Sequence, residues 1–221
     1  MSKIVFDKSG DRLYETGVKK VVLFVQSNGV YGKGVPWNGI TNISESPEGA
    51  EATPLYAGDI KYLNLLSNEE FKASIEAYTY PDEFGVCDGS AELATGVSIG
   101  QQTRSPFGLC YRTTLGNDTE GNEHGYKLHF IYNALAAPSE KAYATINDSP
   151  EAITFNWELT TTPVEVTGFK PTASLVIDST KVANKNKLTE LEDIIYGKDG
   201  DLAAEPRLPL PDEIAQLFKT E

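Results

Sequence analysis

The stretch Phe107-Gly-Leu-Cys-Tyr-Arg-Thr-Thr-Leu115 alternates large side chains with small or polar ones, and Tyr126-Lys-Leu-His-Phe-Ile-Tyr-Asn-Ala134 repeats the pattern. A period of two is typical of strands with one buried face. The intervening residues, Gly116 to Gly125, are turn formers without an apolar side chain, so the two strands are predicted to form an antiparallel hairpin. One face of this hairpin is expected to be apolar and to be covered by another sheet.

Five other segments carry strand signals. Val21-Val-Leu-Phe-Val25, within Lys19 to Gln26, is a continuous apolar run, which is typical of a central strand covered on both faces. Alternation predicts further strands at Trp37 to Ser44, Phe71 to Tyr80, Ile153 to Thr161 and Ala173 to Asp178. The chain is therefore predicted to be mainly β.

Helical signals are confined to short segments. Pro138 to Asn147 begins with Ser139, a favoured N-cap residue, and has apolar residues three apart, so a short helix is predicted there. Lys187 to Tyr196 has helical spacing, and Leu208 to Ile214 is stiffened by proline and runs into a short helix. Because this tail shows no core of its own, residues 181–221 are read as an arm that follows a β domain of residues 1–180.

Two connections are long for a compact domain. Ser44 to Asp59 has no sustained period of either kind, and loops of that length tend to be functional or disordered. It is either a mobile surface loop or an arm that becomes ordered against a partner, and the sequence leaves both open. Gly85 to Gln102 is a second long connection, with room for one turn of helix.

Composition excludes several classes of protein. The 221 residues include 19 Lys and Arg and 32 Asp and Glu, which gives a net charge of −13. Nucleic-acid binders and proteins that dock on anionic membranes depend on basic surfaces, so neither class fits. No apolar run approaches the ~20 residues of a membrane span, and Met1 to Lys8 turns charged too early for a secretory signal. We expect folding in a cytoplasm, with Cys87 and Cys110 as free thiols.

Motifs for catalysis or metal binding are weak. Asn117 to His124 is rich in oxygen ligands, but its glycine is misplaced for a calcium loop, so we interpret it as a structural loop. His124 and His129 are too few for zinc, and His129 is expected to be a half-buried packing residue. The Gly32 and Gly34 loop lacks the ending of a phosphate-binding motif, and no Gly-x-Ser-x-Gly elbow occurs. We expect no enzyme activity, no cofactor and no metal.

A resemblance to a known family runs through nearly the whole chain. The matching segments, in chain order, are Trp37-Asn-Gly-Ile-Thr41, Ser46 to Tyr56, Glu76 to Phe84, Phe107 to Arg112, Gly116-Asn-Asp118, Ala137-Pro-Ser-Glu-Lys141, Thr161-Thr-Pro-Val164 and Leu208 to Glu213. Together they resemble the major tail proteins, or tail tube proteins, of long-tailed phages with non-contractile tails that infect Gram-positive bacteria. Residues 181–187 and 197–205 look like variable spacers.

The resemblance implies a β-sandwich of the tail-tube type with one short flanking α-helix, a long inter-strand loop and a C-terminal arm. It implies a virion structural protein whose hexameric rings stack into the tail tube, the conduit for genome ejection. Its partners would be copies of itself and the tape measure, tail terminator and distal tail proteins, and its location the virion, after assembly in the host cytoplasm. DNA would pass through the lumen without specific binding, because an acidic wall repels phosphates.

Two assembly contacts are predicted on this basis. Apolar residues in the Ser44 to Asp59 segment would be wasted in water, so the segment is expected to join stacked rings through Ser46, Pro47, Glu51, Thr53, Leu55 and Tyr56. The arm is expected to dock on a neighbouring subunit or the next ring through Leu188, Leu191, Leu208 and Leu210. The alternative functions are a non-catalytic β-sandwich carbohydrate-binding module and a glycosidase, which would need a pair of tuned carboxylates.

Overall fold

The computed structural model describes residues 4–146, 148, 151–200 and 203–219. Its main feature is a nine-stranded antiparallel sheet. Its strands are β1 (Leu13–Ser27), β2 (Val30–Tyr31), β3 (Val35–Pro36), β4 (Ile40–Glu45), β9 (Lys72–Ala77), β12 (Phe107–Asn117), β13 (Gly121–Ala136), β14 (Phe155–Thr161) and β15 (Ser174–Asp178). The spatial order is β2-β1-β12-β13-β14-β9-β4, with β15 paired to β13 and β3 to β1. The prediction of a mainly β chain is confirmed.

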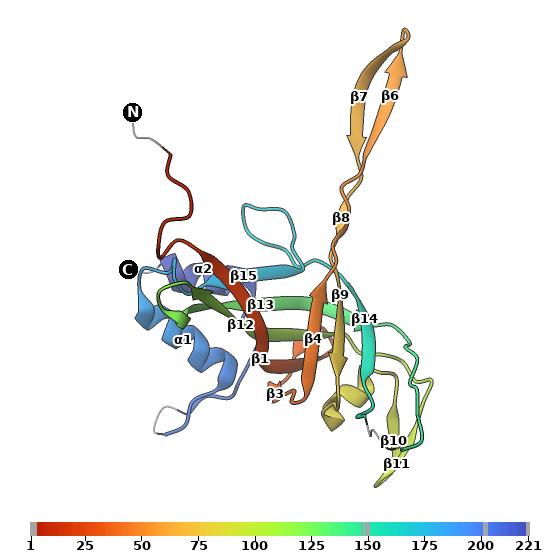
Figure 1. Ribbon diagram of the computed structural model, residues 1–221. Coiled ribbons are helices and arrows are strands. Elements are labelled where there is room, and N and C mark those ends of the chain that lie inside the picture. Colours follow the sequence, from red (N-terminus) through yellow and green to blue (C-terminus); the bar gives the residue numbers. More distant parts are fainter. Residues whose placement is uncertain (1–3, 147, 149–150, 201–202, 220–221) are drawn as a thin grey trace.

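The sheet bends over on itself to form a sandwich. In Figure 1, β4, β9 and β14 run across β1, β12 and β13, so the two groups of strands form two layers. β13 makes the connection, because it pairs along most of its length with β12 and through Ala134 to Ala136 with β14. The first core lies between the layers. It joins Leu23 and Leu109 from one layer to Ile75 and Trp157 from the other, all fully buried.

Two α-helices cover the opposite face of β1, β12 and β13. They are α1 (Lys185–Tyr196) and α2 (Pro211–Lys219), and α1 begins at Asn184, whose side-chain oxygen accepts a hydrogen bond from the Asn186 amide at 3.0 Å. This face forms a second core, whose buried side chains are Val22, Phe24, Cys110, Leu128, Phe130, Tyr132, Ile177, Leu188, Leu191, Ile195, Leu208 and Ile214. The flanking helix that the resemblance implies is therefore present as α1, with α2 beside it.

β1 separates the two cores. Val21 and Leu23 point into the first core, while Val22 and Phe24 point into the second, and all four are less than 8% exposed. This is the strand that the apolar run predicted to be covered on both faces. The predicted strands around Ile75, Trp157 and Ile177 are confirmed as β9, β14 and β15.

The hairpin of β12 and β13 is confirmed, but the prediction of a single apolar face is wrong. Leu109 pairs with Ile131, and Cys110 pairs with Phe130. Leu109 therefore faces the first core, whereas Phe130 faces the second. The apolar sets of the two strands lie on opposite faces of the hairpin, so both faces need a cover. The other layer covers one, and the helices cover the other.

The predicted helix at Pro138 to Asn147 is wrong. Residues 138–146 have no regular secondary structure, and Asn147 lies outside the described residues. Tyr143 and Ile146 are 75% and 87% exposed, so a helix here would have no surface on which to bury its apolar side, and isolated helices of this length are marginal. Instead the Lys141 ammonium lies 2.5 Å from the buried Asp88 carboxylate, which also accepts a hydrogen bond from the Trp157 indole at 3.0 Å. This ion pair holds the segment against the first core.

The long connections are also more regular than predicted. Residues 48–70 form a hairpin of β5 (Glu48–Gly49), β6 (Ala52–Ala57), β7 (Ile60–Leu66) and β8 (Glu69–Glu70). The Ser44 to Asp59 segment, which the sequence left open between a mobile loop and an arm ordered by a partner, therefore has regular β-structure within the chain itself. Gly85 to Gln102 contains the end of a 3₁₀ helix, η1 (Asp82–Val86), and a small hairpin of β10 (Ala91–Ala94) and β11 (Val97–Ile99). Both hairpins extend from the body of the molecule (Figure 1).

Candidate assembly surface

The hairpin of residues 48–70 projects far from the body of the molecule (Figure 1). Its strands β6 and β7 pair from Ala52 and Leu66 to Ala57 and Ile60, where Gly58 and Asp59 make a two-residue turn. Both turn residues have positive φ, 58° and 62°, as a type I′ turn requires. The Gly-Asp pair was a usable sequence signal for this hairpin. It was missed because the strands on either side show no period of two.

The hairpin is continuous at its base with the first core. β5 follows β4, and β8 leads into β9, whose Ala73 and Ile75 are buried. β4 and β9 pair from Ile40 and Ala77 to Glu45 and Ala73. The Lys72 ammonium adds a contact 2.6 Å from the Glu48 carboxylate. The projecting part therefore continues the pair of β4 and β9, and β9 contributes Ala73 and Ile75 to the first core.

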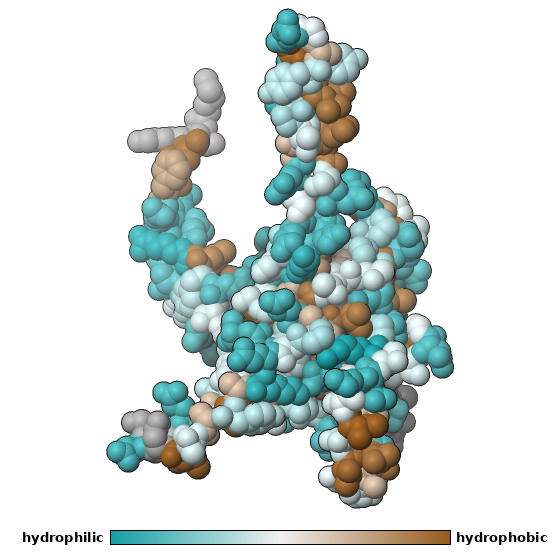
Figure 2. Space-filling view, turned by 90° about the vertical axis from the view of Figure 1, so that its right-hand side faces the viewer, coloured by the Kyte–Doolittle hydropathy of each residue, from teal (hydrophilic) through white to brown (hydrophobic). Residues whose placement is uncertain are grey.

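Every residue of β6 and β7 is exposed, and many of them are apolar. Figure 2 shows the apolar side chains gathered along one side of the hairpin. We call the large apolar residues of the two strands the tip patch: Leu55, Tyr56, Ile60, Tyr62, Leu63, Leu65 and Leu66, which are 40–72% exposed. They occupy both faces of the hairpin, because the pairing of Leu55 with Leu63 puts these two on one face, and Tyr62 then lies on the other. Exposed clusters of this kind mark interaction surfaces in soluble proteins. Within the described part of the chain the tip patch stays exposed to water, so we expect it to contact the surface of a partner.

The residues predicted to join stacked rings all lie on or next to this hairpin. Ser46, Pro47, Glu51, Thr53, Leu55 and Tyr56 are all exposed. Leu55 and Tyr56 belong to the tip patch, while the contribution of β7 was missed. Signals for it were present in the apolar residues of Ile60 to Leu66, which follow directly after the turn. That these residues touch another ring stays a prediction.

The residues predicted to anchor an arm on a neighbouring subunit lie elsewhere. Leu188, Leu191 and Leu208 are at most 5% exposed and pack in the second core of their own chain. The expectation that they dock on another subunit is wrong, because their apolar area is already covered by Phe24, Phe130 and the other residues of the sheet. Leu210, by contrast, is 47% exposed, and its contact with a neighbour stays a prediction.

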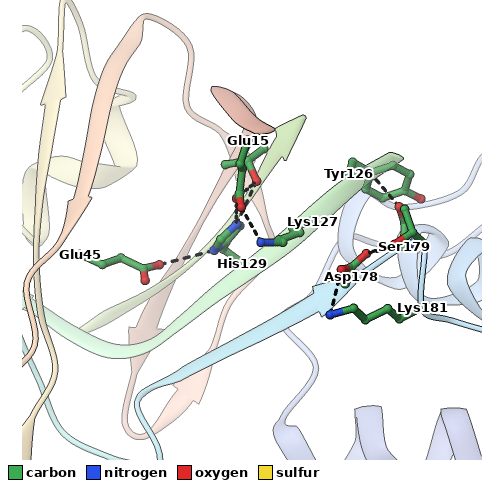
Figure 3. Close-up of polar contacts among 10 residues, drawn as sticks. Glu15, Glu45, Tyr126, Lys127, His129, Asp178, Ser179 and Lys181 are labelled. Carbon is green, nitrogen blue, oxygen red and sulfur yellow. Dashed lines mark hydrogen bonds and ion pairs between the residues drawn. The ribbon is translucent and has the colours of Figure 1, made fainter. Parts of the chain in front are cut away.

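A polar network lies where β1, β13 and β4 approach one another (Figure 3). The His129 ring has a Glu15 carboxylate oxygen 3.2 Å from Nε2 and a Glu45 carboxylate oxygen 3.5 Å from Nδ1. The Lys127 ammonium lies 2.5 Å from Glu15, and the His129 ring stacks on Tyr111 with centroids 4.7 Å apart. His129 is half-buried, as expected, but its ionic partners were missed because they are distant in sequence. Since β4 leads into the projecting hairpin, the network fixes the base of that hairpin to the sheet.

The network lowers the pKa values of both carboxyl groups. For Glu45, the interaction with the His129 ring, 3.5 Å away, is the largest effect; it lowers the pKa, aided by the Tyr111 hydroxyl and opposed by burial. For Glu15, burial is the largest single effect and raises the pKa, but the hydrogen bonds from Lys127 and Thr113 and the nearby charges act in the opposite direction, and the net shift is downward. The folded protein therefore favours the ionised form of both groups.

Stability should therefore fall in acid, and Glu45→Gln should reduce that fall. A group whose folded-state pKa is depressed stabilises fully above its unfolded-state pKa, here near 4.5, and loses this contribution as the pH falls through the folded-state value. We expect Glu45→Gln to cost about 0.5–1 kcal/mol at pH 6 and to flatten the decline below pH 4.5. Urea unfolding at a series of pH values measures both effects. The control is Glu165→Gln at an exposed site, and identical acid slopes for Glu45→Gln and the parent would contradict the prediction.

The loop that carries oxygen ligands has a structural explanation. The Asn117 side-chain oxygen accepts hydrogen bonds from the amides of Thr119 and Glu120, at 3.2 and 2.6 Å, and His124 contacts the Glu120 carboxylate. Within the described residues, no three His, Cys, Asp or Glu side chains are grouped as metal ligands.

Cys87 and Cys110 are free and buried. Among the described helices, none has the length and apolar composition that crossing a bilayer requires.

Comparison with known proteins finds similarity in structure but not in sequence. No protein-family model matches the chain, and no curated protein is significantly similar to it. The baseplate of the anti-feeding prophage, solved by cryo-electron microscopy, contains a chain that is 12% identical, with a TM-score of 0.38, over 82% of this chain and 99% of that chain.

Two further similar chains come from an extracellular contractile injection system in its extended state. One belongs to the PVC sheath–tube complex, at 11% identity and a TM-score of 0.33, over 72% of this chain and 88% of that one. The other belongs to the PVC sheath/tube terminator, at 10% identity and a TM-score of 0.34, over 79% and 99%. All three chains come from assemblies of a prophage or of a contractile injection system. The likeness is slight, and no function is assigned from it.

Proposed function

We propose that this chain is the tail tube protein of a long, non-contractile phage tail, a non-enzymatic structural protein that forms stacked rings. The observation that carries the proposal is the projecting hairpin with its uncovered tip patch. A monomer gains nothing from exposing that much apolar surface on a two-stranded hairpin, which is marginal in isolation. A repeated contact between identical subunits gives the hairpin a partner in every copy.

The sequence motifs supply the rest of the proposal. The resemblance to tail tube proteins spans nearly the whole chain and implies rings of six subunits, with the tape measure, tail terminator and distal tail proteins as neighbours in the virion. The hairpin of residues 48–70 supports this reading, since the segment that resembles the family, Ser46 to Tyr56, includes most of its outgoing half, β5 and β6. The tip patch would then bridge one ring to the next.

The alternative of a carbohydrate-binding module has less support. Modules of that class hold sugars against exposed aromatic rings in a shaped site. Both tryptophans of this chain, Trp37 and Trp157, are at most 3% exposed and lie in the first core. The exposed rings Tyr56 and Tyr62 lie on a two-stranded hairpin that projects from the body of the molecule.

Negative-stain electron microscopy of the purified protein at high concentration tests the proposal. Tubes or rings of uniform diameter are the expected result. Dispersed monomers at every concentration, without any rings, would overturn it and leave the carbohydrate-binding reading in place.

A conduit for DNA should not bind the DNA that passes through it. With a net charge of −13, the protein has no surplus of cations to replace the counterions of phosphates. We expect no retardation of duplex DNA in a gel-shift experiment with micromolar protein at ~0.15 M salt. A clear shift under these conditions, comparable with that of a basic control protein, would contradict the prediction.

A further inference from the structure

A second apolar patch lies at the other end of the molecule from the tip patch. The small hairpin of β10 and β11 exposes Leu93, Val97 and Ile99, at 69%, 51% and 39%. We call these three residues the foot patch. In Figure 1, β10 and β11 are at the bottom of the molecule and β6 and β7 at the top. Each pair forms a separate two-stranded sheet, so neither hairpin is extended by the strands of the sandwich.

Both patches are nearly uncharged in a strongly acidic protein. Residues 52–66 contain one acid, Asp59, and one base, Lys61, and residues 91–99 contain Glu92 as their one charged side chain. Copies of a chain with net charge −13 repel one another over most of their surface. Contact between copies is therefore least costly where the two patches meet. Asp59 and Lys61 leave the tip patch without net charge, so it can meet Glu92 without repulsion, whereas a contact between two foot patches would bring two Glu92 carboxylates together.

The positions of the patches suit a repeated contact. In Figure 2 the two apolar areas lie one above the other along the long dimension of the molecule. A shift of one copy along that direction would bring its tip patch to the foot patch of the next. When two different surfaces of identical subunits meet, one surface of each kind stays unpaired at the ends of the assembly, so the contact repeats from copy to copy. A contact between two tip patches would instead close after two copies.

We propose that the foot patch is the receiving surface for the tip patch of a second copy of this chain. The inference rests on the proposed function and adds to it the surface that each hairpin meets in the next ring. Leu93, Val97 and Ile99 then cover the apolar side of β6 and β7, and the contact stabilises both marginal hairpins at once.

Cysteine cross-linking in the full-length protein tests the pairing. A Tyr62→Cys/Val97→Cys variant is treated with a short bis-maleimide under conditions that give tubes. The native cysteines do not compete, because both are buried and burial raises the pKa of the Cys87 thiol to about 12. We expect a ladder of covalent multimers on a denaturing gel. Mixing Tyr62→Cys with Val97→Cys single variants should give covalent dimers and no ladder.

The matched control is Tyr62→Cys/Phe169→Cys, because Phe169 is 79% exposed but belongs to neither patch. Tubes that form while the Tyr62→Cys/Val97→Cys variant gives no more product than this control would overturn the inference and leave the proposed function standing. Covalent dimers from Tyr62→Cys alone would show contact between tip patches and would also overturn it. So would coupling of Val97→Cys to Phe6→Cys in place of Tyr62→Cys, which would identify the exposed N-terminal segment as the occupant. A parent protein that forms neither rings nor tubes would overturn both proposals.

Discussion

Replacing Leu55 and Tyr56 together by serine should abolish long tubes and leave the melting temperature of the monomer unchanged. The two side chains are 41% and 70% exposed, so the folded monomer loses little packing, and exposed substitutions usually change stability by less than about 0.5 kcal/mol. Apolar anchors at an interface cost ~1 kcal/mol or more each when truncated. If six subunits make the same contact, the loss per junction between rings is on the order of 12 kcal/mol, which is enough to separate them.

The control for this experiment removes a similar pair of side chains outside the hairpin. Tyr143 and Ile146 are 75% and 87% exposed and belong to the irregular segment that follows β13. The Tyr143→Ser/Ile146→Ser variant should form tubes of normal length. Thermal unfolding and electron microscopy of both variants give the two readouts. Tubes of parental length and salt resistance from Leu55→Ser/Tyr56→Ser would place the contact between rings elsewhere.

Deleting residues 197–221 should unfold the protein or bring it close to unfolding. If the tail were an arm, as the sequence suggested, the truncated chain would remain a folded monomer that polymerises poorly. In the structure, Leu208 and Ile214 are at most 5% exposed, and the Tyr132 hydroxyl donates a buried hydrogen bond to the Pro209 carbonyl at 3.0 Å. Deletion would expose Phe24 and Tyr132 to water and leave that hydroxyl without its partner. Circular dichroism and the soluble yield of the truncated chain measure the effect.

Point substitutions separate the loss of the second core from a general effect of shortening the chain. Leu191 is fully buried, and Leu191→Ala should cost roughly 2–5 kcal/mol in the free energy of unfolding. Leu210 is 47% exposed, and Leu210→Ala should cost less than about 0.5 kcal/mol. A truncated chain with a parental melting temperature would show that the helices contribute little to the fold.

Local patterns in the sequence were enough to find the elements that have a core to bury into. The continuous run Val21 to Val25 indicated a strand covered on both faces, and β1 separates the two cores. The alternation around Trp157 and the helical spacing of Leu188, Leu191 and Ile195 gave β14 and α1. In each case burial imposes the period of the element on the sequence, so the period can be read back.

The same reasoning explains the elements that were missed. The strands β6 and β7 are exposed on both faces, so nothing imposes a period of two on residues 52–66. Residues 138–146 have the N-cap and the spacing of a helix, but no surface receives their apolar side, and Lys141 is drawn to Asp88 instead. The network of His129 depends on carboxylates from two other strands, which sequence spacing cannot bring together.

The sequence by itself determined a mainly β chain, its central strand, its long hairpin of β12 and β13 and a helix with three apolar anchors. Only the tertiary structure decided how these parts face one another. Antiparallel pairing of Cys110 with Phe130 turns the apolar sets of β12 and β13 to opposite faces, and a shift of one residue would have put them together. With both faces apolar, the sheet needs two covers, and the helices of residues 185–219 become the second cover rather than an arm for a neighbour. Pairing register and the choice of cover depend on contacts between distant residues, so no local pattern records them.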